Sequence, residues 1–507
     1  MIDRKTSYGL AILSGILLLF SFPPFNLGGF LAWFAFVPLL IALFYENKVK
    51  RMDRLSKIAG LGCILTLLWL AWWFYDFLSW LGFVIGLLLA VGMARELHTK
   101  NYVGDYWKTK KLPSKNLPYL PSALGIFVIP LVATCFEFLL MNVPGLMRIG
   151  GIWGFWSIAK TQWANPAILH LASFTGMYGV TFLVLLVNCA LAYGIIHYKE
   201  TKKIFKPTVI VLCLFAIIFA HGLIDVPSQK EGDVTVAVIQ SPLLEGEDIN
   251  DLYLRLSKES LKYKPQIIVW PFFQYDGFTF PENFTQEHDV YLAGVGVVSP
   301  DGSISTDNLG YHMITLFKNI ADRDVKGVFF PEVHSLDTDL GKFAVVACIE
   351  SGSTLPTRDR VNDGAQFLIV PTGAPNTYVF SWALGTNAIY RAVEHKVFSV
   401  EVIADHDSSM IIDPYGRIIK DVAPEPEIVV GKISFTDDRT FYTKYGDGFG
   451  WTIVALAVIF VIYNSHLKRK SPFKYCKKCR AKIEKDAKTC PKCGTEQRPL
   501  LKRFLFH

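Results

Sequence analysis

The chain has 507 residues, of which 51% are hydrophobic and 19% are charged, whereas soluble domains carry about 25% charged residues. This composition argues against a purely soluble enzyme, and the 14% aromatic content excludes a disordered chain, because such chains are poor in hydrophobic residues. The formal charge of +7 is uneven: residues 465–507 hold 14 Lys and Arg against 3 Asp and Glu, a net +11, which leaves −4 for the rest. We therefore expect no nucleic-acid partner.

Hydrophobic runs of membrane-spanning length recur along the chain, at 8–22, 29–45, 59–93, 119–141, 169–198, 207–224 and 449–464. At 1.5 Å per residue, the run at 59–93 is too long for one crossing of a ~30 Å hydrocarbon core, so we expect a hairpin that turns near Asp76–Ser79. The first run leads directly into more membrane sequence, which favours a helix over a cleaved signal peptide. These runs predict a bundle of eight membrane helices.

Loops rich in Lys and Arg alternate along the chain with loops that are poor in cations. Five lie between 48 and 57, six between 95 and 115 and four between 199 and 206, whereas Ser21–Gly29 has none. Because positively charged short loops stay in the cytoplasm, both termini are predicted to be cytoplasmic in a multi-pass protein of the plasma membrane. The predicted parts are seven helices in 1–224, an extracytoplasmic domain in 225–445, an eighth helix in 446–466 and a small cytoplasmic domain in 471–497.

The predicted outer domain, 225–445, has the composition of a soluble α/β domain, with short β-branched runs separated by Gly, Asp and Pro. Periodicity alone predicts a mixed sheet with helices on one face, the helices being at 249–263 and 383–396. The expected strands are Val234–Gln240, Gln266–Trp270, Val290–Val298, His312–Phe317, Phe343–Cys348, Ala365–Val370, Phe398–Ile403 and Ser409–Ile412.

Four cysteines form two Cys-x-x-Cys pairs in the basic tail, Cys476 with Cys479 and Cys490 with Cys493. Two such pairs, ten residues apart, are typical of a structural zinc site with four thiolate ligands. A redox pair is the alternative, but it needs only one Cys-x-x-Cys. Closed four-thiolate coordination leaves no position for a substrate, so we expect zinc as a structural cofactor and no cofactor for catalysis.

Cys348 is the only cysteine of the predicted outer domain and ends an expected strand, with Glu350 two residues later. A lone cysteine at a strand end is either inert packing or a nucleophile, and the residues alone leave both open. The other four cysteines lie in membrane runs, where we interpret them as small apolar filler. They are Cys63, Cys135, Cys189 and Cys213.

The order of elements resembles that of the bacterial apolipoprotein N-acyltransferases, which join a membrane bundle to a domain of the nitrilase (carbon–nitrogen hydrolase) superfamily. The resemblance covers about 1–465, all but the zinc ribbon, and implies an αββα sandwich for the outer domain. The similar blocks are Phe22–Gly28, Trp33–Leu40, Glu137, Gly176–Gly179, Asn188, Val236–Gln240, Ile268–Pro271, Arg391–Glu394, Ile412–Arg417 and Tyr445–Asp447.

The resemblance also implies a mechanism: a cysteine thiolate attacks an acyl carbon, a glutamate takes the thiol proton and a lysine ammonium stabilises the oxyanion. On this basis Cys348 is the nucleophile, and the lysine is Lys326, five residues before Pro331, with Lys318 a weaker candidate. Without the resemblance Lys326 is a solvated surface group. Glu350 matches a further site glutamate that is not the base.

The base itself is missing, because this chain has Phe272 where the family has glutamate after Trp-Pro. General-base catalysis supplies about 10²–10⁴-fold, and an unassisted thiol of pKa about 8.5 is only a few per cent thiolate at neutral pH. The candidate carboxylates to replace the base are Asp276, Glu282, Glu332 and Glu350.

Three functions fit these residues. The first is a membrane acyltransferase that takes an acyl chain from a membrane lipid onto Cys348 and passes it to the N-terminal amine of a lipoprotein. The second is a catalytically impaired relative that binds lipid or lipoprotein, with the ribbon recruiting a cytoplasmic protein partner. A hydrolytic amidase is the third, but it leaves the membrane bundle without a use. Cys348 and Lys326 favour the first, and Phe272 favours the second.

Overall fold

The computed structural model divides the chain into two compact units, Met1–Ile453 and Val454–His507. The residues that the structure describes are 4–22, 28–45, 125–142, 157–228, 232–240, 248–271, 282–294, 296–305, 335–346, 348–372, 378–403, 409–419, 421–422, 427–470, 473–476, 482–484 and 487–496.

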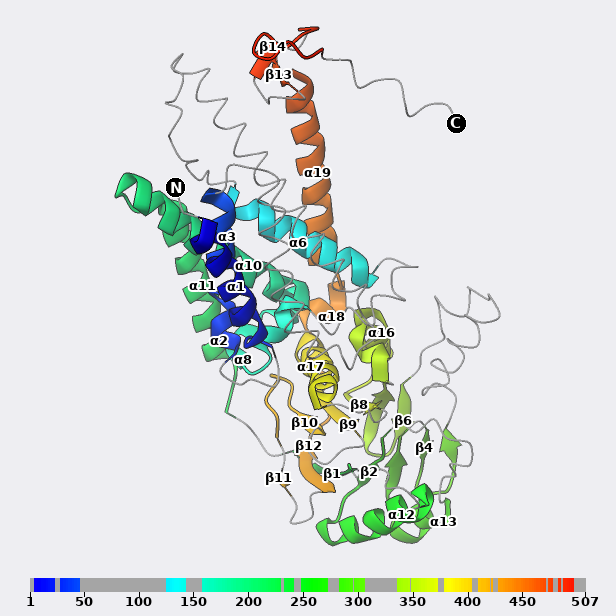
Figure 1. The fold of residues 1–507 in the computed structure, drawn as a ribbon. Coiled ribbons are helices and arrows are strands. Elements are labelled where there is room, and N and C mark those ends of the chain that lie inside the picture. Colours follow the sequence, from blue (N-terminus) through cyan, green and yellow to red (C-terminus); the bar gives the residue numbers. More distant parts are fainter. Residues whose placement is uncertain are drawn as a thin grey trace. The chain divides into compact units, whose positions relative to one another are not determined.

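The first half of the larger unit is helical (Figure 1). Among the described helices, three are long and apolar enough to cross a membrane: α6 (Gly125–Asn142), α10 (Met177–Thr201) and α11 (Lys206–Asp225). They coincide with three of the predicted spans. The shorter helices are α1 (Arg4–Leu19), α2 (Gly28–Ala32), α3 (Val37–Tyr45), η2 (Ile158–Gln162), α8 (Pro166–Leu169) and α9 (Ala172–Thr175). The run at 59–93 lies outside the described residues, so the count of eight stays a prediction.

Two predicted helices are broken. The run at 29–45 forms α2 and α3, and the run at 169–198 becomes a span only from Met177 onward. The second break occurs at Gly176, whose φ is +64° and whose Cα lies so close to the Tyr442 ring that a Cβ would sit 2.6 Å from a ring carbon. Only glycine satisfies both conditions, and hydrophobicity alone does not reveal such a break.

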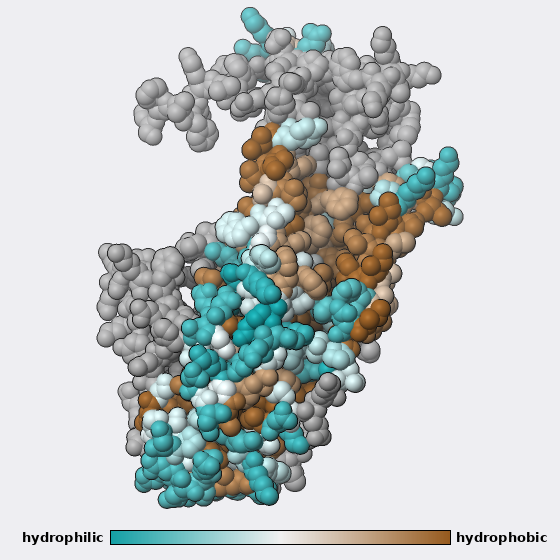
Figure 2. Space-filling view, turned by 180° about the vertical axis from the view of Figure 1, so that it is seen from behind, coloured by the Kyte–Doolittle hydropathy of each residue, from teal (hydrophilic) through white to brown (hydrophobic). Residues whose placement is uncertain are grey.

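Helix α11 is hydrophobic yet largely uncovered by the other residues that the structure describes. Ile217 is 66% exposed and Ile224 is 81% exposed. Exposed apolar surface on this scale marks an interaction with lipid or protein, as the sequence predicts for a membrane span. On the face in Figure 2, hydrophobic residues gather over the helical part and hydrophilic residues over the α/β part.

The α/β part contains two sheets. Their strand orders are β11-β12-β1-β2-β3-β4-β5 and β10-β9-β8-β7-β6. The strands are β1 (Val234–Ile239), β2 (Ile267–Val269), β3 (Tyr291–Ala293), β4 (Val297–Val298), β5 (Ile304–Ser305), β6 (Leu336–Thr338), β7 (Gly341–Val345), β8 (Phe367–Thr372), β9 (Phe398–Ile403), β10 (Met410–Ile412), β11 (Asp421–Val422) and β12 (Ile428–Ile433).

The sheets stack with helices on both outer faces, as the family resemblance implies. Val236 and Val238 belong to the core between the sheets, whereas Ala237 and Ile239 pack outward against α12 (Ile249–Ser260) and α13 (Glu282–His288). Helices α16 (Thr354–Asn362) and α17 (Tyr378–His395) lie on the side of the second sheet (Figure 1). The expectation of one sheet with helices on one face was therefore wrong. Strands that are buried on both faces form continuous hydrophobic runs, so their periodicity does not reveal a second sheet packed against them.

Several predicted strands differ from the observed ones because the chain turns earlier than the hydrophobic pattern indicates. The predicted strand Val290–Val298 is an antiparallel hairpin of β3 and β4. The predicted strand Phe343–Cys348 ends at Val345, and Cys348 begins the 3-10 helix η4 (Cys348–Gly352). The predicted strand His312–Phe317 lies outside the described residues. Periodicity missed three short helices, α13, α16 and α18 (Phe441–Tyr445), and four strands, β5, β6, β11 and β12.

The C-terminal elements are α19 (Gly448–Lys470) and an antiparallel pair, β13 (Phe473–Tyr475) with β14 (Lys482–Glu484). Helix α19 includes the predicted eighth span, and the strand pair lies within the predicted ribbon.

Candidate functional site

Cys348 lies just beyond the carboxyl end of β7. Strands β7, β8 and β9 are parallel, as are β1, β2 and β3 in the other sheet. Ligands of open α/β sheets bind beyond the carboxyl ends of parallel strands. The predicted nucleophile therefore starts a 3-10 turn at the edge of the sheet where active sites of such folds lie.

The turn that begins at Cys348 is held by an ion pair. Arg360 of α16, 1% exposed, places Nη2 3.1 Å from Oε2 of Glu350, which is 12% exposed. Ser353 N–H also donates to the Glu350 carbonyl over 3.0 Å. Glu350, the third predicted site residue, thus fixes η4 against α16.

The other predicted site residues cannot be placed beside Cys348. Five of them lie outside the described residues: Lys326, Lys318, Phe272, Asp276 and Glu332. Glu282 begins α13, and the structure describes its backbone but not its side chain. Assembly of the cysteine, the lysine and a carboxylate therefore stays a prediction.

A buried contact joins the α/β part to the helices. Glu394 of α17 accepts a hydrogen bond of 2.9 Å from Met177 N–H, the first residue of α10. Arg391 Nη1 lies 2.8 Å from the other Glu394 oxygen, and neither side chain is more than 1% exposed. One turn earlier, Tyr390 donates to the Ala159 carbonyl over 2.5 Å. Helix α17 thus anchors the domain to η2 and α10.

A second buried pair of opposite charges, Glu401 and Lys160, lies next to this contact. Glu401 of β9 accepts a hydrogen bond of 2.7 Å from Thr372 of β8, and burial raises its pKa to about 8 against the opposing effects of Thr372 and Lys160. Burial also lowers the pKa of Lys160 well below its ordinary value. Both residues are completely buried. The sequence carries no local signal for this pair, since Lys160 is one of two cations in its loop and Glu401 lies within an apolar strand.

Glu137, one of the residues that resemble the family, organises the loop before α10. Its Oε1 accepts hydrogen bonds from Ser157 (2.7 Å) and Thr181 (2.9 Å). Thr181 in turn accepts from Ala159 N–H over 3.1 Å. Glu137 therefore holds the same loop that supplies Ala159 and Lys160 to the α/β part.

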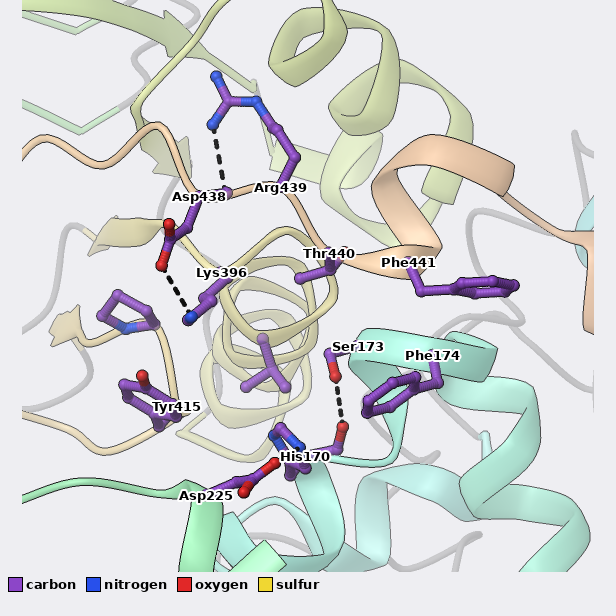
Figure 3. Close-up of a pocket in the computed structure, with 12 residues that line it drawn as sticks. His170, Ser173, Phe174, Asp225, Lys396, Tyr415, Asp438, Arg439, Thr440 and Phe441 are labelled. Atoms are coloured by element: carbon purple, nitrogen blue, oxygen red, sulfur yellow. Dashed lines mark hydrogen bonds and ion pairs between the residues drawn. The ribbon is translucent and has the colours of Figure 1, made fainter.

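A cavity of about 410 Å³ lies where the ends of α8, α9 and α11 meet the α/β part. Figure 3 shows Lys396 pointing toward Asp438, with 2.8 Å between Nζ and Oδ2, and His170 next to Asp225. The lining is mixed in charge and includes the aromatic rings of Phe174, Tyr415 and Phe441. The cavity is thus a polar pocket, distinct from η4.

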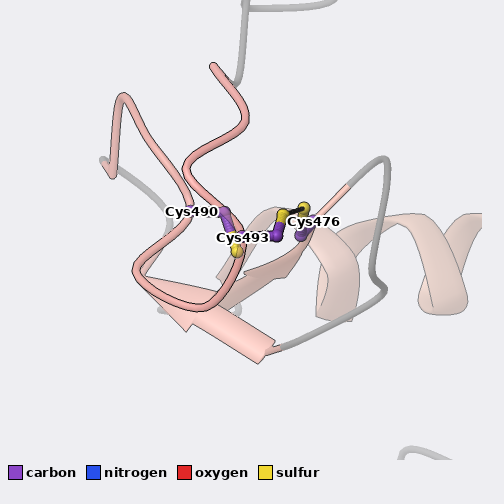
Figure 4. A group of neighbouring side chains, drawn as sticks. All are labelled: Cys476, Cys490 and Cys493. Atoms are coloured by element: carbon purple, nitrogen blue, oxygen red, sulfur yellow. Dashed lines mark hydrogen bonds between the residues drawn. The ribbon is translucent and has the colours of Figure 1, made fainter.

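Three of the four predicted zinc ligands cluster in the tail (Figure 4). Cys476, Cys490 and Cys493 have their sulfur atoms within 4.8 Å of one another, and those of Cys476 and Cys493 are 3.6 Å apart. Tetrahedral zinc with Zn–S bonds of about 2.3 Å needs sulfur atoms about 3.8 Å apart, so the residues fit the metal. Cys479 lies outside the described residues.

Three family models match the chain. The apolipoprotein N-acyltransferase N-terminal domain matches residues 14–190, carbon-nitrogen hydrolase matches 269–440 and the zinc-ribbon domain matches 475–497. These matches confirm the predicted resemblance.

Similar proteins extend over most of the chain. An apolipoprotein N-acyltransferase of Geobacter metallireducens is 24% identical, over 90% of this chain and 94% of its own length. One from Thermotoga maritima is also 24% identical, over 89% and 92%. A solved structure of a carbon-nitrogen hydrolase from Helicobacter pylori G27 is 14% identical, covering 46% of this chain and 98% of that chain with a TM-score of 0.32.

Proposed function

We propose that this chain, which is apolipoprotein N-acyltransferase-like over nine tenths of its length and ends in a zinc ribbon, is a membrane N-acyltransferase. It moves an acyl chain from a membrane lipid, through a thioester on Cys348, to the N-terminal amine of a lipoprotein. The ribbon holds a structural zinc ion and offers a surface for a cytoplasmic protein partner.

One observation carries the proposal: Cys348 begins η4 directly after a parallel strand of the matched carbon-nitrogen hydrolase domain. The contact between Glu394 and Met177 supports it further, because it attaches that domain to the helices of the matched N-terminal domain. A soluble amidase has no use for such an attachment, whereas an enzyme that takes its acyl group from a lipid needs it.

The proposed reaction has two halves. In the first, a base takes the Cys348 thiol proton and the thiolate attacks the carbonyl carbon of a lipid ester, so that a C–S bond forms, the C–O bond breaks and the base returns the proton to the leaving alcohol. In the second, an amine nitrogen attacks the thioester carbon, the C–N bond forms, the C–S bond breaks and the amine proton passes to a base. Lys326 stabilises the oxyanion in both halves.

Glu350 acts in this proposal as a positioning residue, because its carboxylate is already held by Arg360. Phe272 cannot accept a proton, so Asp276, Glu282 or Glu332 takes the role of base. Phe272 also favours the alternative function, a relative that binds lipid or lipoprotein without transferring an acyl chain.

The proposal is tested by incubating the full chain in lipid nanodiscs with an ester phospholipid. We expect a hydroxylamine-sensitive acyl mass on the Cys348 peptide, absent from Cys348→Ala and retained in Cys213→Ala, whose cysteine is exposed on α11. Addition of a peptide that begins with a lipid-modified cysteine should discharge the thioester and acylate the peptide amine.

A folded, membrane-inserted chain whose Cys348 stays unmodified, but which retains the lipid-modified peptide, would support the binding function instead. Hydrolysis of simple amides without acylation of the peptide would indicate an amidase.

A further inference from the structure

Two histidines and an aspartate converge at the end of α11. His221 and Asp225 are one turn apart on this helix, and His170 is the C-cap residue of α8. Asp225 Oδ2 lies 3.3 Å from His170 Nε2 and 3.4 Å from His221 Nδ1. The two imidazole rings stack with their centroids 5.5 Å apart. Both nitrogens thus approach the same carboxylate oxygen.

Close packing of α8 and α11 creates this arrangement. Gly222, next to His221, is buried against Ala167, where a Cβ would lie 2.0 Å from the Ala167 carbonyl oxygen. Any larger residue would push the helices apart. The spacing of His221 and Asp225 then places both on one face of α11, toward the His170 ring.

Hydrogen bonding does not explain the cluster. His170 Nε2 is a buried atom that lies within ion-pair distance of Asp225 but has no partner with good hydrogen-bond geometry. A central cation would give each of the three ligand atoms a partner. Ligands about 2.0–2.1 Å from a tetrahedral zinc ion are about 3.3 Å apart, which agrees with both distances to Asp225 Oδ2.

We propose that His170, His221 and Asp225 form a second metal site that binds a zinc ion, separate from the cysteine ribbon. Two imidazoles and one carboxylate suit zinc and leave one coordination position open. His170 and Asp225 also line the cavity of Figure 3, so a water molecule or an anionic group in that cavity takes the open position.

The test counts zinc in the full chain, purified in detergent and equilibrated with buffered zinc. We expect about two ions per chain in the wild type, about one in His221→Gln or Asp225→Asn, about one in Cys490→Ser/Cys493→Ser, and none when His221→Gln joins the cysteine changes. The matched control is His288→Gln, an exposed histidine on α13, which should keep both ions. Zinc content that is unchanged in both His221→Gln and Asp225→Asn overturns the proposal.

Cobalt substitution gives an independent readout in the cysteine variant. Co²⁺ at the proposed site should produce visible d–d bands without thiolate charge-transfer absorption, and His221→Gln should remove them. Bands that survive this change would place the ion elsewhere and overturn the proposal. The readout needs no enzymatic activity, so it is independent of the proposed acyl transfer.

Discussion

Glu394 accepts a hydrogen bond from Met177 N–H across 217 residues of sequence. Met177 is the first residue of α10, and its N-cap, Gly176, has no side chain to cap the helix. A carboxylate at a helix N-terminus satisfies a free N–H group and interacts favourably with the helix dipole. The α/β domain thus caps a predicted membrane span, which couples the stability of the two parts.

Breaking the buried pair behind this cap should destabilise the larger unit. Arg391→Met leaves Glu394 buried without its cation, and loss of one partner of a buried pair costs about 3–5 kcal/mol. Thermal unfolding of the detergent-solubilised chain measures the effect. The control is Lys396→Met, which removes the more exposed pair with Asp438 and should cost about 0–1 kcal/mol. Equal effects of the two variants would contradict the anchoring role.

The titration of Glu401 should contribute to the pH dependence of the free energy of unfolding. Its pKa rises from 4.5 to about 8 on folding, so between these values the folded chain holds a proton that the unfolded chain releases. The neutral Glu401 carboxyl therefore contributes its whole stabilisation to the free energy of unfolding below about pH 4.5, and this contribution is lost as the pH rises through about 8. Lys160, whose pKa burial lowers, acts in the opposite sense.

Glu401→Gln removes this titration and keeps an acceptor for the Thr372 hydroxyl. We expect the variant to gain stability relative to the wild type as the pH rises from about 5 to about 9. Chemical denaturation across this range measures the difference. A difference that stays constant with pH would show that Glu401 is ionised in the folded chain.

Arg360 should affect acyl transfer through the position of η4. Arg360→Met releases Glu350, and a displacement of about 1 Å at a reacting group can cost about 10²-fold in rate. Arg360→Lys should recover part of the loss, because it restores a cation beside Glu350. Arg255→Met, which removes an exposed pair with Glu259, is the control. The rate of thioester formation on Cys348 is the measurement, and no change in Arg360→Met would exclude the positioning role.

The sequence predicted the parts better than their contacts. Hydrophobic runs located α6, α10 and α11 because burial and membrane insertion both require apolar residues, and the cysteine spacing located the ribbon. It could not reveal that Glu394 meets Met177 or that Glu401 lies near Lys160, since these pairs depend on tertiary packing and carry no local pattern. The helix break at Gly176 likewise follows from packing, against the Tyr442 ring.

The ribbon should not contribute to the chemistry at Cys348. Cys476, Cys490 and Cys493 form their cluster within the smaller unit, and four thiolates leave zinc no open position. Deletion of 471–507 should therefore leave the rate of Cys348 acylation unchanged while removing about one zinc ion per chain. A well-folded truncated chain that no longer acylates Cys348 would assign the ribbon a part in the reaction.

Phe272 offers the sharpest test between the two functions. Phe272→Glu places a proton acceptor where the resembling family has one, so thioester formation on Cys348 should become faster, with an upper limit of about 10²–10⁴-fold from general-base catalysis. Phe272→Gln is the matched control, because it has nearly the same shape as the glutamate variant but cannot take the proton at neutral pH. Single-turnover acylation in lipid nanodiscs measures both. If glutamate and glutamine change the rate equally, another carboxylate already takes the thiol proton, and Asp276, Glu282 and Glu332 become the residues to replace.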